Sequence, residues 1–296
     1  MINSPGTDRE LLTKKAYATD EALATRQHIH DQYTVPPVDF LNWVLDRIVW
    51  TGDESVLDVG LGSGTYLEPV RRRVPNGSIF GADLSAGMAQ RAASKGVAHL
   101  IANGDVQALP FPSNTFDVVL ANHMLYHVPD VEKALSELRR VLKPSGTLIA
   151  ATNSQFNMPE FDQLMRRVFS QIGVTGIEVE NFISPPARNF TLEDAPTKLS
   201  HHFRAVARFD LPSALVFPNK QPVIDYFASM KALREPLLPS RVIWDEFMEK
   251  LSEQVNRLIT HFGELVVNKL IGVVIGTDAG GFAKEYLEQL NKSGLR

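Results

Sequence analysis

Short apolar runs alternate with segments of helical periodicity between about residue 55 and residue 152. Such runs are typical of buried strands. Strands that alternate with helices predict a parallel sheet covered by helices on both faces, and hence an α/β fold. The predicted strands are 55–59, 78–83, 98–102, 116–121 and 147–152, and the helices between them are 64–73, 86–95 and 131–141.

The flanking parts of the chain have a helical pattern. Residues 8–32 predict one or two helices, for which Asp8 and Asp20 are candidate N-caps. A further helix is predicted over 38–50, whose apolar residues lie on one face. Beyond residue 153 the chain becomes richer in proline, and helices are predicted over 159–173, 221–233 and 240–262.

Composition narrows the class of protein. The chain has 296 residues, with 30 Lys and Arg against 34 Asp and Glu, so its formal net charge is −4. This balance argues against a nucleic-acid-binding protein, which normally carries a basic stripe. The absence of cysteine excludes thiolate metal sites and cysteine nucleophiles. Because no apolar stretch reaches the ~18 residues of a membrane span and the N-terminus does not resemble a secretory signal, we expect a cytoplasmic protein.

A glycine-rich turn follows the first predicted strand. Asp58 at the strand end precedes Gly60, Gly62 and Gly64. Glycines let a ligand approach the main chain, and the following helix N-terminus offers free N–H groups. The spacing is G-x-G-x-G rather than the G-x-G-x-x-G of a dinucleotide fold, and Asp58 suits a ligand with a cationic ammonium better than a phosphate. The alternative is a tight strand–helix turn that binds nothing.

Acidic residues also follow the next two strands. Asp83 could accept two hydrogen bonds from a ribose diol, or Asp83 or Ser85 could be the N-cap of the helix that begins at Ala86. Asp105 could accept a hydrogen bond from an exocyclic adenine amine, or it could belong to a plain turn.

The ordered motifs resemble those of class I S-adenosylmethionine-dependent methyltransferases, and in particular the group with the ubiquinone/menaquinone-biosynthesis and small-molecule methyltransferases. The similarity runs from about Ser55 to Thr152. One departure is Leu61, where the family often has a smaller residue. The matching motifs are Val56-Leu-Asp-Val-Gly-Leu-Gly-Ser-Gly64, Gly81-Ala-Asp-Leu-Ser85, Gly104-Asp-Val-Gln-Ala-Leu-Pro-Phe111, Phe116-Asp-Val-Val-Leu-Ala121, Leu125-Tyr-His-Val-Pro-Asp130 and Leu138-Arg-Arg-Val-Leu-Lys-Pro-Ser-Gly146.

The resemblance implies a doubly wound, seven-stranded, mostly parallel Rossmann-like sheet with an antiparallel edge strand and a helical cap. The two strands still missing fit residues 203–217 and 265–277, which are rich in Val and Ile. The expected organisation is an N-terminal helical lid (1–50), an S-adenosylmethionine-binding core (51–153) and a part that completes the sheet (154–296), with substrate-cap inserts at 154–182 and 219–262.

The resemblance also implies roles for individual residues. Asp58 and the Gly60 backbone would hold the methionine end of S-adenosylmethionine, and Asp83 would bind the ribose. Leu84 and Met88 would pack near the adenosine, and Asn122 would lie under the sulfonium. The complete expected cofactor set is Tyr33, Asp58, Gly60, Gly62, Gly64, Asp83, Leu84, Met88, Gly104, Asp105, Val106 and Asn122.

The acceptor of the methyl group is a small molecule of unknown identity. A hydroxyl or carbon acid would need a general base, whereas an unprotonated amine would not. His127 is the candidate catalytic base and is weighed against a structural or substrate-lining role; His123 is a weaker candidate. Tyr33 could close over the methionine moiety from the lid. Apolar side chains of the cap inserts could line a substrate pocket, although core packing is the simpler interpretation.

Other interpretations remain open at this level. An RNA-modifying methyltransferase would favour a basic surface, a cofactor-binding regulator would lack turnover, and a nicotinamide dehydrogenase would need different glycine spacing. No metal is predicted, because the paired histidines lack suitable spacing. Substrate and oligomeric state are not determined.

Overall fold

The computed structural model describes residues 6–16, 20–183 and 189–280, which form two compact units. Unit 1 draws on 1–38, 154–188 and 211–271, and unit 2 on 39–153, 189–210 and 272–296. Each unit therefore contains segments that are distant in the sequence. The predicted core of 51–153 falls within unit 2. The predicted lid and cap boundaries stay predictions.

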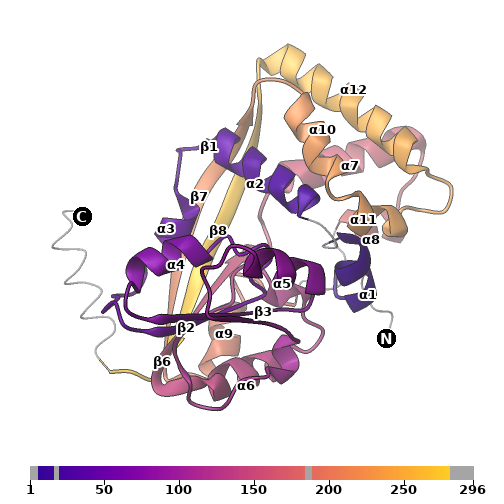
Figure 1. Cartoon of the computed structure of the whole chain (residues 1–296). Helices are drawn as coiled ribbons and strands as arrows, with labels where there is room; N and C mark the ends of the chain where they lie inside the picture. Colours follow the sequence, from indigo (N-terminus) through magenta and orange to yellow (C-terminus); the bar gives the residue numbers. More distant parts are fainter. Residues whose placement is uncertain (1–5, 17–19, 184–188, 281–296) are drawn as a thin grey trace. The chain divides into compact units, whose positions relative to one another are not determined.

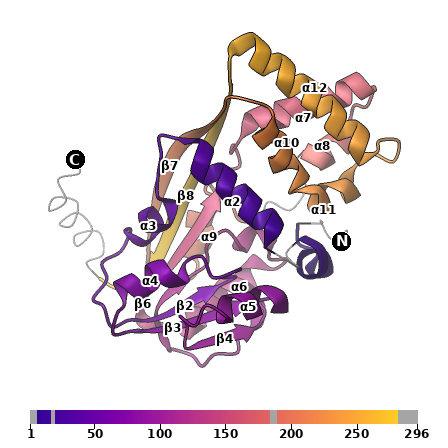
Figure 2. The same ribbon diagram turned by 45° about the horizontal axis from the view of Figure 1, so that its top comes forward.

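The sheet has the predicted parallel centre, and these parallel strands lie in unit 2 (Figures 1 and 2). Its strand order is β7-β8-β6-β5-β2-β3-β4, and β2 pairs in parallel with both β3 and β5. The doubly wound, mostly parallel fold with antiparallel edge strands is confirmed. The strands are β2 (Ser55–Val59), β3 (Ser78–Asp83), β4 (Leu100–Asn103), β5 (Phe116–Leu120), β6 (Leu142–Asn153), β7 (Ala205–Phe217) and β8 (Leu265–Thr277).

An additional strand was not predicted. The two residues of β1 (Thr34–Val35) pair antiparallel with Leu215 and Ala214 of β7, which gives eight strands where the resemblance implies seven. Two residues are too few for the alternation of polar and apolar positions to reveal a strand.

Local capping explains the helices of unit 2. Asp130 accepts a hydrogen bond from Lys133 N (3.0 Å) at the start of α6, and the buried residues of that helix recur with helical spacing. α6 ends at Val141. The following turn requires Gly146, because a Cβ there would lie 3.0 Å from the Phe116 carbonyl oxygen. The helices are α3 (Phe40–Leu45), α4 (Leu67–Arg73), α5 (Ala86–Ala93), α6 (Val131–Val141) and α9 (Ala195–Ser200).

Two predicted helices are too long. The helix predicted over 38–50 ends at Leu45, because the Trp50 indole N–H donates to the Leu45 carbonyl (2.7 Å). The helix predicted over 221–233 divides after Ala228, because Ser229 caps it through a hydrogen bond from its hydroxyl to the Tyr226 carbonyl (2.6 Å). Sequence periodicity does not reveal either interaction.

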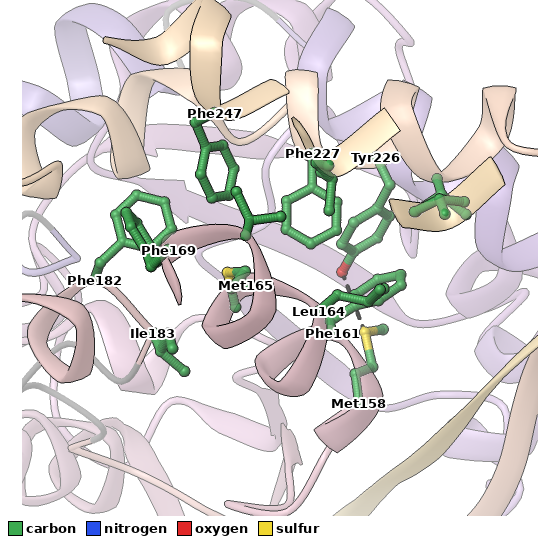
Figure 3. Packing of buried hydrophobic residues seen from close by; sticks show 14 of the residues in the cluster. Met158, Phe161, Leu164, Met165, Phe169, Phe182, Ile183, Tyr226, Phe227 and Phe247 are labelled. Atoms are coloured by element: carbon green, nitrogen blue, oxygen red, sulfur yellow. Dashed lines mark hydrogen bonds between the residues drawn. The ribbon is translucent and has the colours of Figure 1, made fainter. Parts of the chain in front are cut away.

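Unit 1 is mainly helical around an aromatic core. In Figure 3 the rings of Phe169, Phe182 and Phe247 lie against one another, with centroids 5.0–5.3 Å apart. The Tyr226 hydroxyl donates to Met158 Sδ (3.6 Å) within the same core. The helices are α1 (Arg9–Leu11), which continues as a π-helical turn (Leu12–Ala16), α2 (Glu21–Tyr33), α7 (Pro159–Ile172), α8 (Ile177–Ile183), α10 (Gln221–Ala228), α11 (Lys231–Arg234) and α12 (Trp244–Phe262).

The cap side chains weighed as pocket-lining residues contribute to this core. Phe161, Met165, Phe169, Phe227 and Phe247 are all buried in it. Core packing, the simpler interpretation, accounts for their burial. Within the described part of the chain, no helix is long and apolar enough to cross a membrane.

We expect Phe169→Ala to lower the free energy of unfolding by about 3–5 kcal/mol, because it leaves a cavity in the aromatic core of unit 1. The matched control is Phe156→Ala in the same unit, where the ring is 67% exposed. Unfolding in guanidinium chloride measures the free energy of unfolding of both variants, and only Phe169→Ala should show the large decrease. Equal destabilisation by both would contradict the core seen in Figure 3.

Candidate functional site

The candidate site lies at the carboxyl edge of the sheet in unit 2. The chain order reverses at β2, because β3 follows on one side and β5 lies on the other. Open parallel sheets bind ligands at such a switch point. Asp58 in β2 stands opposite Gly81 of β3 and Leu120 of β5, so the ends of three strands meet here.

The glycine turn after β2 has a backbone that only glycine adopts readily. Gly60, Gly62 and Gly64 have φ values of 65°, 57° and 78°. A Cβ on Gly60 would lie 2.7 Å from the Met124 Cβ. The turn therefore cannot accept a side chain at Gly60, where Met124 packs against the main chain.

Asp83 anchors this turn to the end of β3. Its Oδ2 accepts a hydrogen bond from Gly62 N (2.8 Å), and its Oδ1 accepts one from Ser85 N (2.8 Å). The N-cap of α5 is Ser85, whose hydroxyl accepts from Met88 N (3.4 Å). The N-cap alternative for Asp83 is therefore wrong. Burial raises the pKa of the Asp83 carboxyl, against the effect of both hydrogen bonds, and each oxygen keeps a second lone pair for a ligand.

Asp58 is a buried carboxylate without a counter-ion among the described residues. It is 3% exposed, and its Oδ2 has no hydrogen-bond partner there. Burial, with a smaller contribution from the negative charge of Asp83, raises the pKa of Asp58 to about 8. Such a group is costly unless a donor or a cation pairs with it. The position therefore suits a ligand that carries an ammonium.

Two further buried polar atoms at this edge have no partner within the described residues. The Asn122 side chain accepts from Ala151 N (3.0 Å) through Oδ1, while its Nδ2 has no acceptor. The Tyr66 hydroxyl is also unpaired, and burial together with the charges of Asp58 and Asp39 raises the pKa of Tyr66 well above its ordinary value. Sequence reasoning missed Tyr66. The available signal was a phenol two residues beyond the last glycine of the turn.

The loop after β4 lies next to the Asp83 backbone. Gly104 N donates to the Asp83 carbonyl (2.9 Å). Asp105 accepts hydrogen bonds from Gln107 N (3.0 Å) and from the Gln107 side chain, so the interpretation as a turn has direct support. Val106 and Met88 are buried here, and Leu84 is 37% exposed. The roles expected for these residues toward an adenine stay predictions.

Both candidate histidines lie just beyond β5. His127 ends a short 3-10 turn (Leu125–His127), with its ring centroid 4.6 Å from that of Tyr126. His123 has a φ of 53°, which is rare for a residue with a side chain, and its ring lies 5.4 Å from Phe40. Residues in this conformation cluster at functional sites.

Tyr33 is the one expected cofactor residue outside unit 2. It belongs to unit 1, where its ring lies 5.4 Å from Phe217. Its expected role over the methionine moiety stays a prediction. No group of three His, Asp or Glu side chains suited to a metal occurs among residues 6–16, 20–183 and 189–280. The His202 ring instead contacts Glu132 (2.9 Å).

Comparisons with known proteins agree with this geometry. Residues 57–150 match a family model described as "Methyltransferase domain". The demethylmenaquinone methyltransferase of Shouchella clausii is 36% identical over 124 residues, which cover 40% of this chain and 53% of that protein. The chain thus spans about half the length of the first curated relatives it matches.

Two solved structures share the fold. The YcgJ protein of Bacillus subtilis has a TM-score of 0.53 and 19% identity, covering 81% of this chain and 98% of that chain. The phosphoethanolamine N-methyltransferase 2 of Haemonchus contortus, in complex with phosphomonomethylethanolamine and S-adenosylhomocysteine, has a TM-score of 0.55 and 16% identity. The match covers 92% of this chain and 60% of the Haemonchus contortus chain.

We expect Asp58→Asn to raise the melting temperature of the ligand-free protein at pH 8 and to raise it less toward pH 4. Because the folded pKa of about 8 lies above the ordinary 3.8, the folded protein keeps a proton that the unfolded chain loses. Stability of the wild type therefore falls as the pH rises through this window, and asparagine removes that loss.

The control for this measurement is Asp53→Asn, which alters an exposed carboxylate bonded to the Thr51 hydroxyl. Thermal melts across the pH range compare the two variants with the wild type. A pH-independent effect of Asp58→Asn would contradict the burial of an unpaired carboxyl.

Proposed function

We propose that this chain, whose residues 57–150 form a class I S-adenosylmethionine-dependent methyltransferase domain, transfers a methyl group from S-adenosylmethionine to a small molecule by in-line displacement. The observation that supports it most is the set of unpaired polar atoms at the switch point. Asp58 Oδ2 requires a donor, the Asn122 amide requires an acceptor, and the Tyr66 hydroxyl can serve as either. A ligand with an ammonium, a carboxylate and hydroxyls has the groups to pair with them.

The residues present fit S-adenosylmethionine. Asp58 would hold the ammonium and return to its ionised form, and the glycine turn at Gly60 and Gly62 would face the amino-acid end. Asp83 would accept from the ribose hydroxyls through its remaining lone pairs. When bound, S-adenosylmethionine supplies a methyl group already activated by a sulfonium.

The work left to the protein is positioning and exclusion of water. The nucleophile must lie about 3–3.5 Å from the methyl carbon, in line with the bond that breaks. The rigid strand ends of β2, β3 and β5 supply a fixed platform for this alignment. An amine acceptor needs only to be unprotonated, whereas a hydroxyl or carbon acid must lose a proton to a base. His127 is proposed as that base, at its imidazole nitrogen.

The proposed acceptor is a small molecule. The names of the relatives include a demethylmenaquinone methyltransferase and a phosphoethanolamine N-methyltransferase, and both names denote small-molecule acceptors. The net charge of −4 gives a nucleic-acid substrate no electrostatic support.

We expect S-adenosylhomocysteine to bind the wild-type protein and NAD not to bind. Asp58→Asn should weaken S-adenosylhomocysteine binding at least about tenfold, or about 1.4 kcal/mol, because asparagine cannot neutralise the ammonium. Isothermal titration calorimetry measures the affinity, with Asp53→Asn as the matched control. Asp58→Asn is thus expected to stabilise the ligand-free protein and to weaken its binding of S-adenosylhomocysteine. Substitution of a residue with a purely structural role would not have both effects. If the folded wild-type protein does not bind S-adenosylhomocysteine, the proposed function is wrong.

We expect His127→Gln to leave S-adenosylhomocysteine affinity within about twofold and to lower methyl transfer to a hydroxyl or carbon acceptor by about 10²–10⁴-fold, the usual contribution of general base catalysis. The acceptor comes from a screen with isotope-labelled methyl donor. The low-pH limb of the rate profile should disappear in the variant. Retention of that limb, or loss of affinity instead of rate, would assign His127 a structural role.

A further inference from the structure

Unit 1 contains one lysine at a core-facing position of a strand. Along the part of β8 in this unit, Leu265, Val267, Lys269 and Ile271 are buried, while Val266 and Asn268 are exposed. Side chains two residues apart share a face of a strand, so Lys269 occupies a position that the pattern reserves for an apolar side chain. It is 8% exposed.

The hydrogen bonds of the Lys269 amine do not include a carboxylate among the described residues. Among the described residues, its hydrogen bonds go to the Thr34 hydroxyl (3.0 Å) and the His30 Nδ1 (3.4 Å). Burial lowers the pKa of Lys269 to about 8, and the negative charge of Asp31 opposes this only in part. Lysine is rarely buried unless a counter-ion accompanies it. An anion is therefore the missing partner.

A second unsatisfied group lies on the same face. Thr34 stands opposite Leu215 on β7, and residues opposite each other in an antiparallel pair share a face. Ser213 is two residues from Leu215 and shares that face by alternation. Since β7 lies between β1 and β8, the hydrogen bond from Lys269 to Thr34 passes over it. The buried Ser213 hydroxyl has no partner among the described residues.

We propose that Lys269, Thr34 and Ser213 form a binding site in unit 1 for the carboxylate of a small monoanionic molecule with an aromatic or otherwise apolar body. One ammonium and two hydroxyl donors match a single carboxylate in charge and in number of acceptors. A phosphate dianion would call for further cations. Aromatic rings lie next to the polar groups: Tyr226 meets His30 edge-on at 5.7 Å, and Phe217 contacts Tyr33, the neighbour of Thr34.

This site stands on unit 1 alone and does not require methyl transfer. A second consequence rests on the proposed function: if the chain transfers methyl groups to a small molecule, carboxylic acids are the acceptor class to screen first. Binding and catalysis are therefore tested separately on the same protein.

The probes are benzoate, its uncharged analogue benzamide, and inorganic phosphate, each titrated into the full chain and followed by ligand-observed NMR. Benzoate should bind at least about tenfold more tightly than benzamide, and phosphate should not displace it. Lys269→Met should abolish the preference for benzoate, and Ser213→Ala should weaken benzoate binding several-fold. The matched control is Lys250→Met, which alters a partly exposed lysine of unit 1 that is paired with Glu253 and should leave binding unchanged.

Benzoate affinity should also fall as the pH rises through about 8, because a bound anion favours the charged amine. The titratable groups near the amine are His30 and Asp31 from α2 and Tyr226 from α10. The wild-type pH titration needs no variant, so it keeps the test valid even if Lys269→Met fails to fold. Lys269→Met should otherwise melt at the same temperature as the wild type or higher, because it removes a buried charge.

Equal binding of benzoate and benzamide, unchanged benzoate binding by folded Lys269→Met, or equal competition by phosphate would each overturn the proposal. S-adenosylhomocysteine affinity is measured on the same samples. If the protein binds benzoate but not S-adenosylhomocysteine, the proposed function is overturned and the carboxylate site is retained. If it binds S-adenosylhomocysteine but not benzoate, only the carboxylate site is overturned.

Discussion

The burial of the Asp58 carboxylate at the end of β2 is the constraint on which the functional edge of unit 2 depends. A carboxylate with one oxygen unpaired destabilises the folded chain, and its raised pKa is the measure of that cost. Around it, Asp83 fixes the glycine turn through Gly62, and Gly60 cannot be replaced because Met124 packs where its Cβ would lie. Under the proposed function, a cationic group of the ligand would relieve this cost by pairing with the carboxylate.

Unit 1 also contains a buried ionisable side chain, but this one is a potential cation, Lys269. Its aromatic core is closely packed, yet Lys269 projects from β8 toward a hydroxyl and an imidazole rather than a carboxylate. Natural proteins retain such destabilising groups mainly where a ligand compensates for them. The two buried charges differ in one respect. Asp58 lies within motifs shared with a large family, whereas Lys269 lies outside residues 57–150.

The elements that the sequence predicted best are those whose signal is local. β2, β3 and β8 have the predicted bounds, and α6 ends where a lysine–proline pair stops it. The errors at helix ends occurred where a nearby side chain bonds to a backbone carbonyl, which hydrophobic periodicity does not encode: the Trp50 indole bonds to the Leu45 carbonyl, and the Ser229 hydroxyl bonds to the Tyr226 carbonyl. β1 escaped prediction because its pairing with Leu215 involves residues far apart along the chain.

By itself the sequence determined the alternation of strands and helices, the glycine turn, and the carboxylates at the strand ends, because each depends on residues within a few positions of one another. The tertiary structure decided which polar groups stay unpaired. Tyr66 and Ser213 look ordinary in the sequence, although their buried hydroxyls have no partner among the described residues. Lys269 looks equally ordinary, although its buried amine bonds to a hydroxyl and an imidazole rather than to a carboxylate. The tertiary structure also decided the role of Asp83. Ser85 is the N-cap of α5, and the Asp83 carboxylate accepts a hydrogen bond from Gly62 N in the glycine turn. Burial and hydrogen-bond satisfaction arise only when segments distant in the chain come together.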